Sequence, residues 1–187
     1  MEREESAIAQ ECASGNFQNF NRLYDAYVRK IHDFMYFRTY HRQTAEDLTS
    51  LTFTKVVEHF NTYKPVAGSF STWLYRIARN TLYDHYRTSK MILEFPETWE
   101  IASGEHLEKQ FDARQTLREV REYLNTLPRE TRDIVLLRVW DGLSYAEISR
   151  IVGKSESACK MSMMRTVQKL KVTTPYAMLL LSILSKI

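Results

Sequence analysis

Apolar residues recur at helical spacing through most of this chain. The first such stretch contains Phe17, Phe20, Leu23, Tyr24, Tyr27, Val28, Ile31 and Phe34. A second begins near Thr44 and continues through Leu48, Leu51, Thr52, Val56 and Phe60, and a third covers residues 71–86, with Leu74, Ile77, Ala78 and Leu82 as its predicted buried face. The 187 residues include only four prolines and five glycines, and none of these falls inside the three stretches. Because this spacing is typical of amphipathic helices, we expect an all-α protein.

Residues 144–171 predict a helix-turn-helix with a basic second helix. Ser144 is a residue that caps helices, and Glu147, three positions later, completes a capping box. Gly153 marks the end of the first helix, where a left-handed residue is favoured, and Ser155 can cap the second helix. A second helix presented in this way fits the major groove of DNA. The alternative is a helical hairpin packed inside an all-α domain.

Composition divides the chain into two small helical domains joined by an acidic linker. Residues 91–112 contain Lys109 as their single Lys or Arg residue, and their acids are Glu94, Glu97, Glu100, Glu105, Glu108 and Asp112. Pro96 and Gly104 lie in the same stretch, which has little sustained periodicity. The predicted domains are therefore residues 1–90 and 113–172, with the linker at 91–112 and an apolar tail at 173–187.

The tail is unusual because residues 176–187, YAMLLLSILSKI, are apolar almost all round. The segment is too short to span a bilayer, which requires about 20 residues. Pro175 suits the first position of a helix. We expect a terminal helix buried against the rest of the protein, and a membrane-surface or partner-binding role is the alternative.

The sequence contains none of the common catalytic motifs, neither a P-loop nor G-x-G-x-x-G, H-E-x-x-H or G-x-S-x-G. The five histidines are scattered, and Cys12 and Cys159 lie far apart without a CxxC pattern. We therefore expect no catalytic residues, no metal site, no cofactor and no small-molecule substrate. The acidic N-terminus does not resemble a secretory signal, and no apolar run is long enough for a membrane span, so the expected location is the cytoplasm.

Residues 73–90 form a basic segment, although the net charge of the whole chain is only +3. This segment carries Arg76, Arg79, Arg87 and Lys90 against the single acid Asp84. With Leu74 and its neighbours buried, the cations and Tyr83 remain for other faces, together with Tyr75 and Tyr86. Guanidinium groups pair with phosphates, and aromatic rings stack on unpaired bases. The polar loop at 61–69 is placed to wall a pocket for an extruded base. The alternative is a solvated basic face with half-buried tyrosines.

Two motif blocks resemble bacterial sigma factors. Residues 45–56, AEDLTSLTFTKV, followed by residues 70–80, FSTWLYRIARN, resemble region 2 of that family. Residues 127–171 resemble its region 4, and the compact two-domain length is similar to that of the extracytoplasmic-function (ECF) group. The resemblance covers residues 15–90 and 113–171.

This resemblance implies a non-enzymatic factor that binds core RNA polymerase and directs promoter recognition and DNA opening. The residues implied in docking on the β′ clamp helices are Glu46, Asp47, Thr49, Ser50 and Lys55. Those implied in recognition and melting of the −10 element are Tyr63, Lys64, Ser69, Trp73, Arg76, Arg79, Asn80, Tyr83, Asp84 and Arg87. Those implied at the −35 element are Ser155, Glu156, Ser157, Lys160, Met161, Ser162, Arg165 and Lys169. The implied partners are the polymerase core, including its β flap, promoter DNA and an anti-sigma factor.

The chain departs from the family pattern in its second basic helix. Ser162 and Val167 stand where arginines are common, so we expect weaker −35 binding with a flatter salt dependence. Leu51 occupies a position of the clamp-docking helix that is often polar or acidic. The apolar tail has no counterpart in the compact family pattern. A stand-alone helix-turn-helix regulator is the main alternative, and a sigma-like decoy that does not bind promoters is another.

Overall fold

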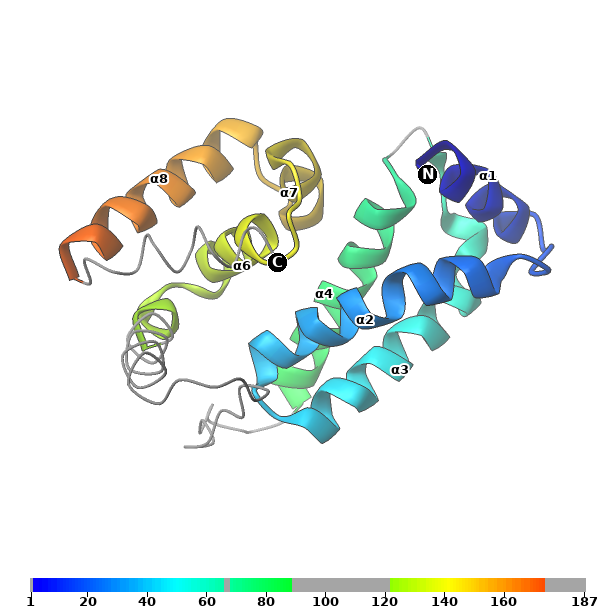
Figure 1. Cartoon of the computed structure of the whole chain (residues 1–187), viewed down its shortest axis with the longest axis horizontal. Coiled ribbons are helices and arrows are strands. Elements are labelled where there is room, and N and C mark those ends of the chain that lie inside the picture. Colours follow the sequence, from blue (N-terminus) through cyan, green and yellow to red (C-terminus); the bar gives the residue numbers. More distant parts are fainter. Residues whose placement is uncertain (1, 66–67, 89–121, 174–187) are drawn as a thin grey trace, which may run out of the picture. The chain divides into compact units, whose positions relative to one another are not determined.

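The computed structural model describes residues 2–65, 68–88 and 122–173, and every regular element in these ranges is a helix. The expected all-α fold is thus confirmed. The chain divides into two compact units, one with α1 to α4 and the other with α6 to α8 (Figure 1). The first contains α1 (Glu2–Ala13), α2 (Phe20–Thr39), α3 (Arg42–Glu58), the 3-10 helix η1 (Phe60–Thr62) and α4 (Phe70–Thr88). The second contains α6 (Arg129–Val139), α7 (Tyr145–Val152) and α8 (Glu156–Thr173). The expected linker at 91–112 and the tail at 176–187 lie outside the described residues.

The N-terminal unit is built on α2, which packs along α3, while α3 packs in turn on α4 (Figure 1). The buried face of α2 includes Leu23, Tyr27, Ile31 and Phe34, and their spacing of three and four residues is that of one helical stripe. The prediction from periodicity is therefore confirmed for this helix. Two members of the predicted stripe differ: Phe17 precedes the helix, and Tyr24 is 40% exposed.

Phe60 is the centre of an aromatic cluster that holds the connection between α3 and α4. Its side chain is 1% exposed, and its ring stacks on Phe70 with centroids 5.8 Å apart and planes at 8°. Phe20 meets the ring edge-on at 6.0 Å, and Trp73 lies 5.2 Å away. The start of α4 is thereby packed against the end of α3 and the beginning of α2.

Helix α1 was not expected from the sequence, because its residues are mostly acidic or polar and its apolar positions are few. It packs against α2, η1 and α4. Ile8, Ala9 and Cys12 are buried, and burial raises the pKa of the Cys12 thiol. Tyr27 donates a hydrogen bond to Glu5 with an O–O distance of 2.6 Å. An acidic residue of the kind that obscures the helical pattern in the sequence thus also binds α1 to α2.

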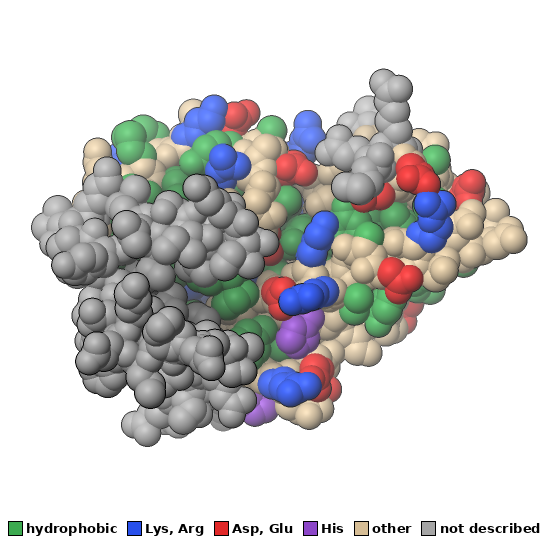
Figure 2. Space-filling model, in the orientation of Figure 1, with side chains coloured by type: hydrophobic (Ala, Val, Ile, Leu, Met, Phe, Trp, Pro, Cys, Tyr) green, Lys and Arg blue, Asp and Glu red, His purple; other side chains and the backbone are tan. Residues whose placement is uncertain are grey.

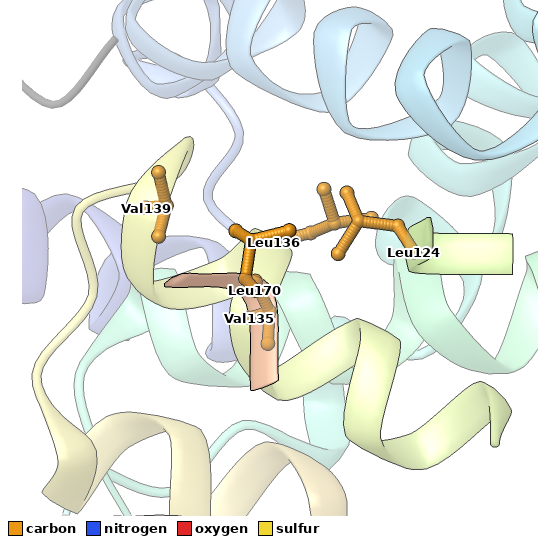
Figure 3. Packing of buried hydrophobic residues seen from close by; sticks show 5 residues of the cluster. All are labelled: Leu124, Val135, Leu136, Val139 and Leu170. Atoms are coloured by element: carbon orange, nitrogen blue, oxygen red, sulfur yellow. The ribbon is translucent and has the colours of Figure 1, made fainter. Parts of the chain in front are cut away.

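The C-terminal unit encloses a compact apolar core. Leu136 of α6 and Leu170 of α8 lie together in it and are each 2% exposed (Figure 3). Leu124, in a helical segment that precedes α6, completes the core, and Arg132 of α6 donates a hydrogen bond to its carbonyl at 2.9 Å. The core therefore fastens α8 to α6 at the end away from the turn between α7 and α8.

The helix-turn-helix is formed by α7 and α8, as predicted. Ser144 Oγ accepts a hydrogen bond from the Glu147 N–H at 3.3 Å, and the Glu147 carboxylate accepts one from the Ser144 N–H at 2.9 Å. Gly153 ends α7 with a φ of 74°, a left-handed conformation that glycine adopts without steric cost. Ser155 Oγ accepts from the Ala158 N–H at 3.2 Å at the start of α8. The local sequence signals therefore determine both ends of this turn.

Replacement of Phe60 by alanine tests the aromatic cluster. We expect F60A to lower the free energy of unfolding of the N-terminal unit by about 3–5 kcal/mol, because it removes a fully buried ring and leaves a cavity. Urea denaturation of the full chain measures this, with the C-terminal unit as an internal reference. F17A is the matched control, since Phe17 contacts the same ring but is 39% exposed. An equal loss in the two variants would contradict the assignment.

Replacement of Ser144 tests the capping box. We expect S144A to destabilise the C-terminal unit by about 0.5–2 kcal/mol, because the N–H groups of the first turn of α7 lose an acceptor. The variant S144D keeps an acceptor at the same place and should retain most of the stability. Thermal unfolding followed by circular dichroism compares the two, and a loss as large in S144D as in S144A would argue against the cap.

Candidate nucleic-acid interface

One face of α4 collects most of the residues expected at the −10 element. The residues at 76, 79, 80, 83, 84 and 87 recur at spacings of three and four and therefore share one side of the helix. Arg76, Asn80 and Arg87 are exposed, whereas Arg79, Tyr83 and Asp84 are half-buried. The opposite side, with Leu74 and Leu82, is buried in the core. The helix thus presents cations and an aromatic ring on a surface that core packing holds in place.

Arg79 and Tyr83 form a stacked pair on this face. The guanidinium carbon of Arg79 lies 4.4 Å from the centroid of the Tyr83 ring, and its Nη2 donates to the Tyr83 hydroxyl at 3.1 Å. The contact limits the rotation of both side chains. A flat cation and a flat ring are consequently ordered one turn apart before any ligand binds.

The structure corrects the expectation for two tyrosines. Tyr63 is only 4% exposed, with its ring 5.6 Å from that of Trp73, and burial raises its pKa. It is therefore part of the aromatic cluster and is not available to stack on a base. Tyr75, expected on an outer face, is 2% exposed and packs on Phe34 at 5.5 Å. Tyr75 is a core residue because it shares a face of α4 with the buried Ala78 and Leu82.

The remaining −10 candidates lie at or before the start of α4. Ser69 Oγ accepts a hydrogen bond from the Thr72 N–H at 3.2 Å, so it caps the helix. Trp73 is half-buried against the aromatic cluster, and Lys64 is exposed on the preceding loop. Of this group, Lys64 offers an exposed charge and Trp73 a partly exposed ring edge.

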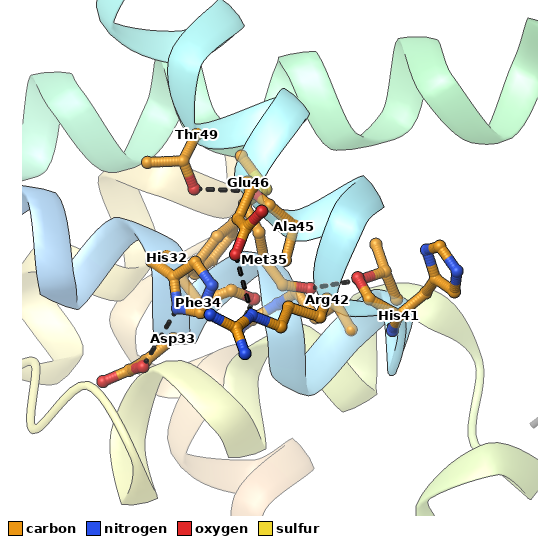
Figure 4. A network of polar contacts seen from close by, with 11 residues as sticks. His32, Asp33, Phe34, Met35, His41, Arg42, Ala45, Glu46 and Thr49 are labelled. Carbon is orange, nitrogen blue, oxygen red and sulfur yellow. Dashed lines mark hydrogen bonds and ion pairs between the residues drawn. The ribbon is translucent and has the colours of Figure 1, made fainter. Parts of the chain in front are cut away.

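The outer face of α3 carries most of the residues expected to dock on polymerase. Glu46, Asp47 and Ser50 are exposed, and Glu46 accepts a hydrogen bond from Arg42 at 2.9 Å (Figure 4). Thr49 is a correction: it is 6% exposed and donates its hydroxyl hydrogen to the Ala45 carbonyl at 2.7 Å. It lies on the inner side of the helix, so it exposes little surface to a partner.

An apolar groove of ≈ 550 Å³ between α2 and α3 adjoins this docking face. Tyr24 and Val57 lie on it and are 40% and 43% exposed. Tyr24 was expected in the buried stripe of its helix, and Val57 was not among the expected docking residues. Leu51, on the same outer face of α3, is 44% exposed. On α3 the available signal was helical spacing, because Leu51 follows Asp47 by four residues and Val57 follows Ser50 by seven.

A chain of ion pairs connects α3 with the basic face of α4. Lys55 of α3 lies 3.4 Å from Asp84, and Asp84 lies 3.1 Å from Arg87. Asp84 therefore has two cations around it, which lowers its repulsion of a phosphate. Figure 2 shows acidic and basic side chains interspersed among apolar ones on the face that it draws.

The exposed face of α8 contains the residues expected at the −35 element. The exposed residues among them include Ser157, Lys160, Met161 and Arg165. Ser162 is less exposed, because it lies at the side of this face and is half-buried. Met164, which was not among the expected −35 residues, is 48% exposed in the middle of this face. Its spacing of four from Lys160 was the signal that could have found it. An apolar side chain there is suited to contact the methyl group of thymine.

Lys160 is held by its neighbours. Its Nζ lies 2.7 Å from Glu156 and 5.8 Å from the centroid of the Tyr145 ring of α7. The acid offsets part of its charge, and the two contacts limit the movement of its side chain.

In the ranges that the structure describes, no group of three or more His, Cys, Asp or Glu residues is placed to hold a metal. Among the helices of these ranges, none combines the length and the apolar character that a membrane span requires.

Comparison with known proteins agrees with this arrangement. Residues 23–91 match the family model for sigma-70 region 2, and residues 117–170 match that for sigma-70 region 4. The ECF RNA polymerase sigma factor BldN of Streptomyces coelicolor is 32% identical over 177 residues, which cover 90% of this chain and 65% of BldN. The RNA polymerase sigma factor YlaC of Bacillus subtilis is 31% identical over 157 residues, which cover 80% of this chain and 88% of YlaC.

A solved structure shares the fold. CnrH, in its complex with the cytosolic domain of CnrY, superimposes with a TM-score of 0.66 at 22% identity, covering 90% of this chain and 95% of CnrH. Two family models in the expected order, together with the similarity to YlaC over most of its length, determine the family. The chain belongs to the sigma-70 family of RNA polymerase sigma factors, in the ECF group.

Proposed function

We propose that this ECF-group protein, as a factor of transcription initiation, divides promoter recognition between α4 and α8. The exposed face of α4 binds the non-template strand at the −10 element, and the exposed face of α8 reads the −35 duplex. The observation that carries the proposal is the single face of α4 on which Arg76, Arg79 and Tyr83 stand together. In this role the protein contributes promoter specificity, while polymerase carries out the chemistry in the cytoplasm.

Strand opening on α4 follows from the chemistry of its side chains. Arg76 and Arg87 pair with phosphates, and the Arg79–Tyr83 stack offers a flat surface to an unstacked base. Each base that stacks on an aromatic ring contributes about 1–3 kcal/mol, which offsets part of the free energy of unpairing. Because their contact with each other orders the two side chains in advance, little conformational entropy is lost when the base binds.

Docking on polymerase is assigned to the outer face of α3. Glu46, Asp47 and Ser50 supply polar contacts, and Leu51 and Val57 supply apolar area. We also propose that an anti-sigma factor covers this face, since it combines exposed apolar side chains with acids. The CnrH structure contains the cytosolic domain of CnrY as its partner, and this supports the proposal only as an analogy.

Charge removal on α4 tests the opening step. The variants R76Q and R79Q should reduce the formation of open complexes by at least about tenfold, since a charged hydrogen bond to a phosphate contributes about 1.5–3 kcal/mol. Permanganate reactivity of unpaired thymines at a promoter measures opening, and circular dichroism establishes that the variants fold. R22Q removes an exposed arginine from α2 and should open normally. Wild-type opening by both α4 variants would refute the assignment.

The salt dependence of −35 binding tests the assignment of α8. Three exposed cations, Lys160, Arg165 and Lys169, lie on this helix. Their contacts with phosphates would give a slope of log K against log [salt] of about −2.7, and K160Q should flatten it by about 0.9. Fluorescence anisotropy with holoenzyme and labelled −35 duplex measures the slope. K154Q is the control because Lys154 pairs with Glu130 at 2.9 Å and precedes α8. Equal flattening by both variants would contradict a specific role for Lys160.

A further inference from the structure

The C-terminal unit has a groove that the proposed function leaves without an occupant. Its volume is ≈ 650 Å³, and it lies between the segment that leads into α6 and the last turns of α8. Tyr123, Leu127 and Pro128 form one wall. Tyr123 is fixed there because its hydroxyl donates to the Thr166 carbonyl at 3.3 Å. This wall is mainly apolar and rests on the core around Leu136.

The opposite wall belongs to the helix that we assign to the −35 element. Ser162, Arg165 and Lys169 of α8 line it, and all three are among the residues expected to contact DNA. Any segment that binds in the groove therefore lies against these side chains. Occupation of the groove and binding of the duplex compete for the same residues.

Residues 176–187 have the composition of a segment that must be buried. Nine of the residues in YAMLLLSILSKI are apolar, and Leu180, Ile183, Leu184 and Ile187 follow the i, i+3, i+4, i+7 pattern of one helical face. Ser182 and Ser185 would lie on the other side of such a helix. The segment thus has a continuous apolar stripe to cover, while its few polar residues lie on the other side among further apolar ones.

The distances along the chain suit the groove. α8 ends at Thr173, so only Thr174 and Pro175 separate it from the apolar segment. Pro175 disfavours the helical conformation for the residue before it, which permits a change of direction there. The wall from Ser162 to Lys169 is about 10 Å long at 1.5 Å per residue, about two turns of a helix lying antiparallel to it.

We propose that residues 176–187 of this same chain bind along the groove and cover Ser162, Arg165 and Lys169. The segment fills the apolar wall with its stripe and holds the −35 surface in a masked state. The masking of the −35 surface rests on the proposed function. The binding of the segment to the groove does not.

A spin label measures the binding directly in the full chain. A nitroxide on S182C is selective because Cys12 and Cys159 are buried. We expect it to broaden the amide resonances of residues 123–131 and 162–169 and to leave those of α2 unaffected. The double variant L180D/L184D should abolish the broadening, whereas the control S185D should preserve it. The absence of broadening in the C-terminal unit would overturn the proposal, as would its persistence in L180D/L184D.

Duplex affinity measures the masking. A segment bound about nine-tenths of the time weakens −35 binding about tenfold, so removal of residues 176–187 should tighten it by that factor. Unchanged affinity after removal would overturn the masking role. A failure of the proposed function would look different from a failure of this inference. Core polymerase would then gain no promoter selectivity from the full chain or from the chain without residues 176–187, while the broadening would persist. Binding of the segment to lipid vesicles, with loss of the broadening, would also contradict the proposal.

Discussion

The burial of one side of α4 determines what its other side can do. Leu74, Tyr75, Ala78 and Leu82 are at most 2% exposed, so the helix cannot rotate without exposing its core face to water. Burial of a leucine side chain such as Leu74 or Leu82 stabilises by about 1.5–3 kcal/mol. The position of Arg79 and its neighbours is therefore a consequence of hydrophobic packing. A surface for an unstacked base exists here because a core exists behind it.

The aromatic cluster around Phe60 extends this constraint to the loop before α4. Tyr63, which the family resemblance implied as a DNA contact, instead contributes its ring to the cluster. The loop is thus held from within by aromatic packing, while Lys64 and Ser69 remain at or near its surface. Residues of this short segment thus serve both the stability of the unit and the proposed recognition of DNA. Replacement of one of its aromatic rings would therefore also affect the position of α4.

Much of the fold could be predicted from the sequence, and the exceptions have physical causes. The ends of α7 and α8 depend on local hydrogen bonds of Ser144, Glu147 and Ser155, which a sequence pattern identifies. The burial of Thr49 depends on packing against another helix, which no local pattern reports. Helix α1 was missed because its apolar stripe is short and consists of Ile8, Ala9 and Cys12, which are buried by contacts with other helices. The exposure of Met164 follows from spacing alone, but an apolar residue is not ordinarily sought at a DNA surface.

Two weak sites on two compact units can act together when a chain joins them. The face that we propose for DNA binding on each unit carries few cations, and α8 has serine and valine where related helices commonly have arginine. When polymerase holds both units, binding at one element raises the effective concentration of the other unit at the second element. Such a protein should consequently read promoters well only as part of the holoenzyme.

Transcription with purified core polymerase tests this central claim most directly. A library of DNA fragments is transcribed by core polymerase with and without the full chain, and the 5′ ends of the transcripts are sequenced. The account predicts transcripts that start at a limited set of sites with two shared upstream elements, and only when the chain is present. Starts that are the same with and without the chain would contradict it.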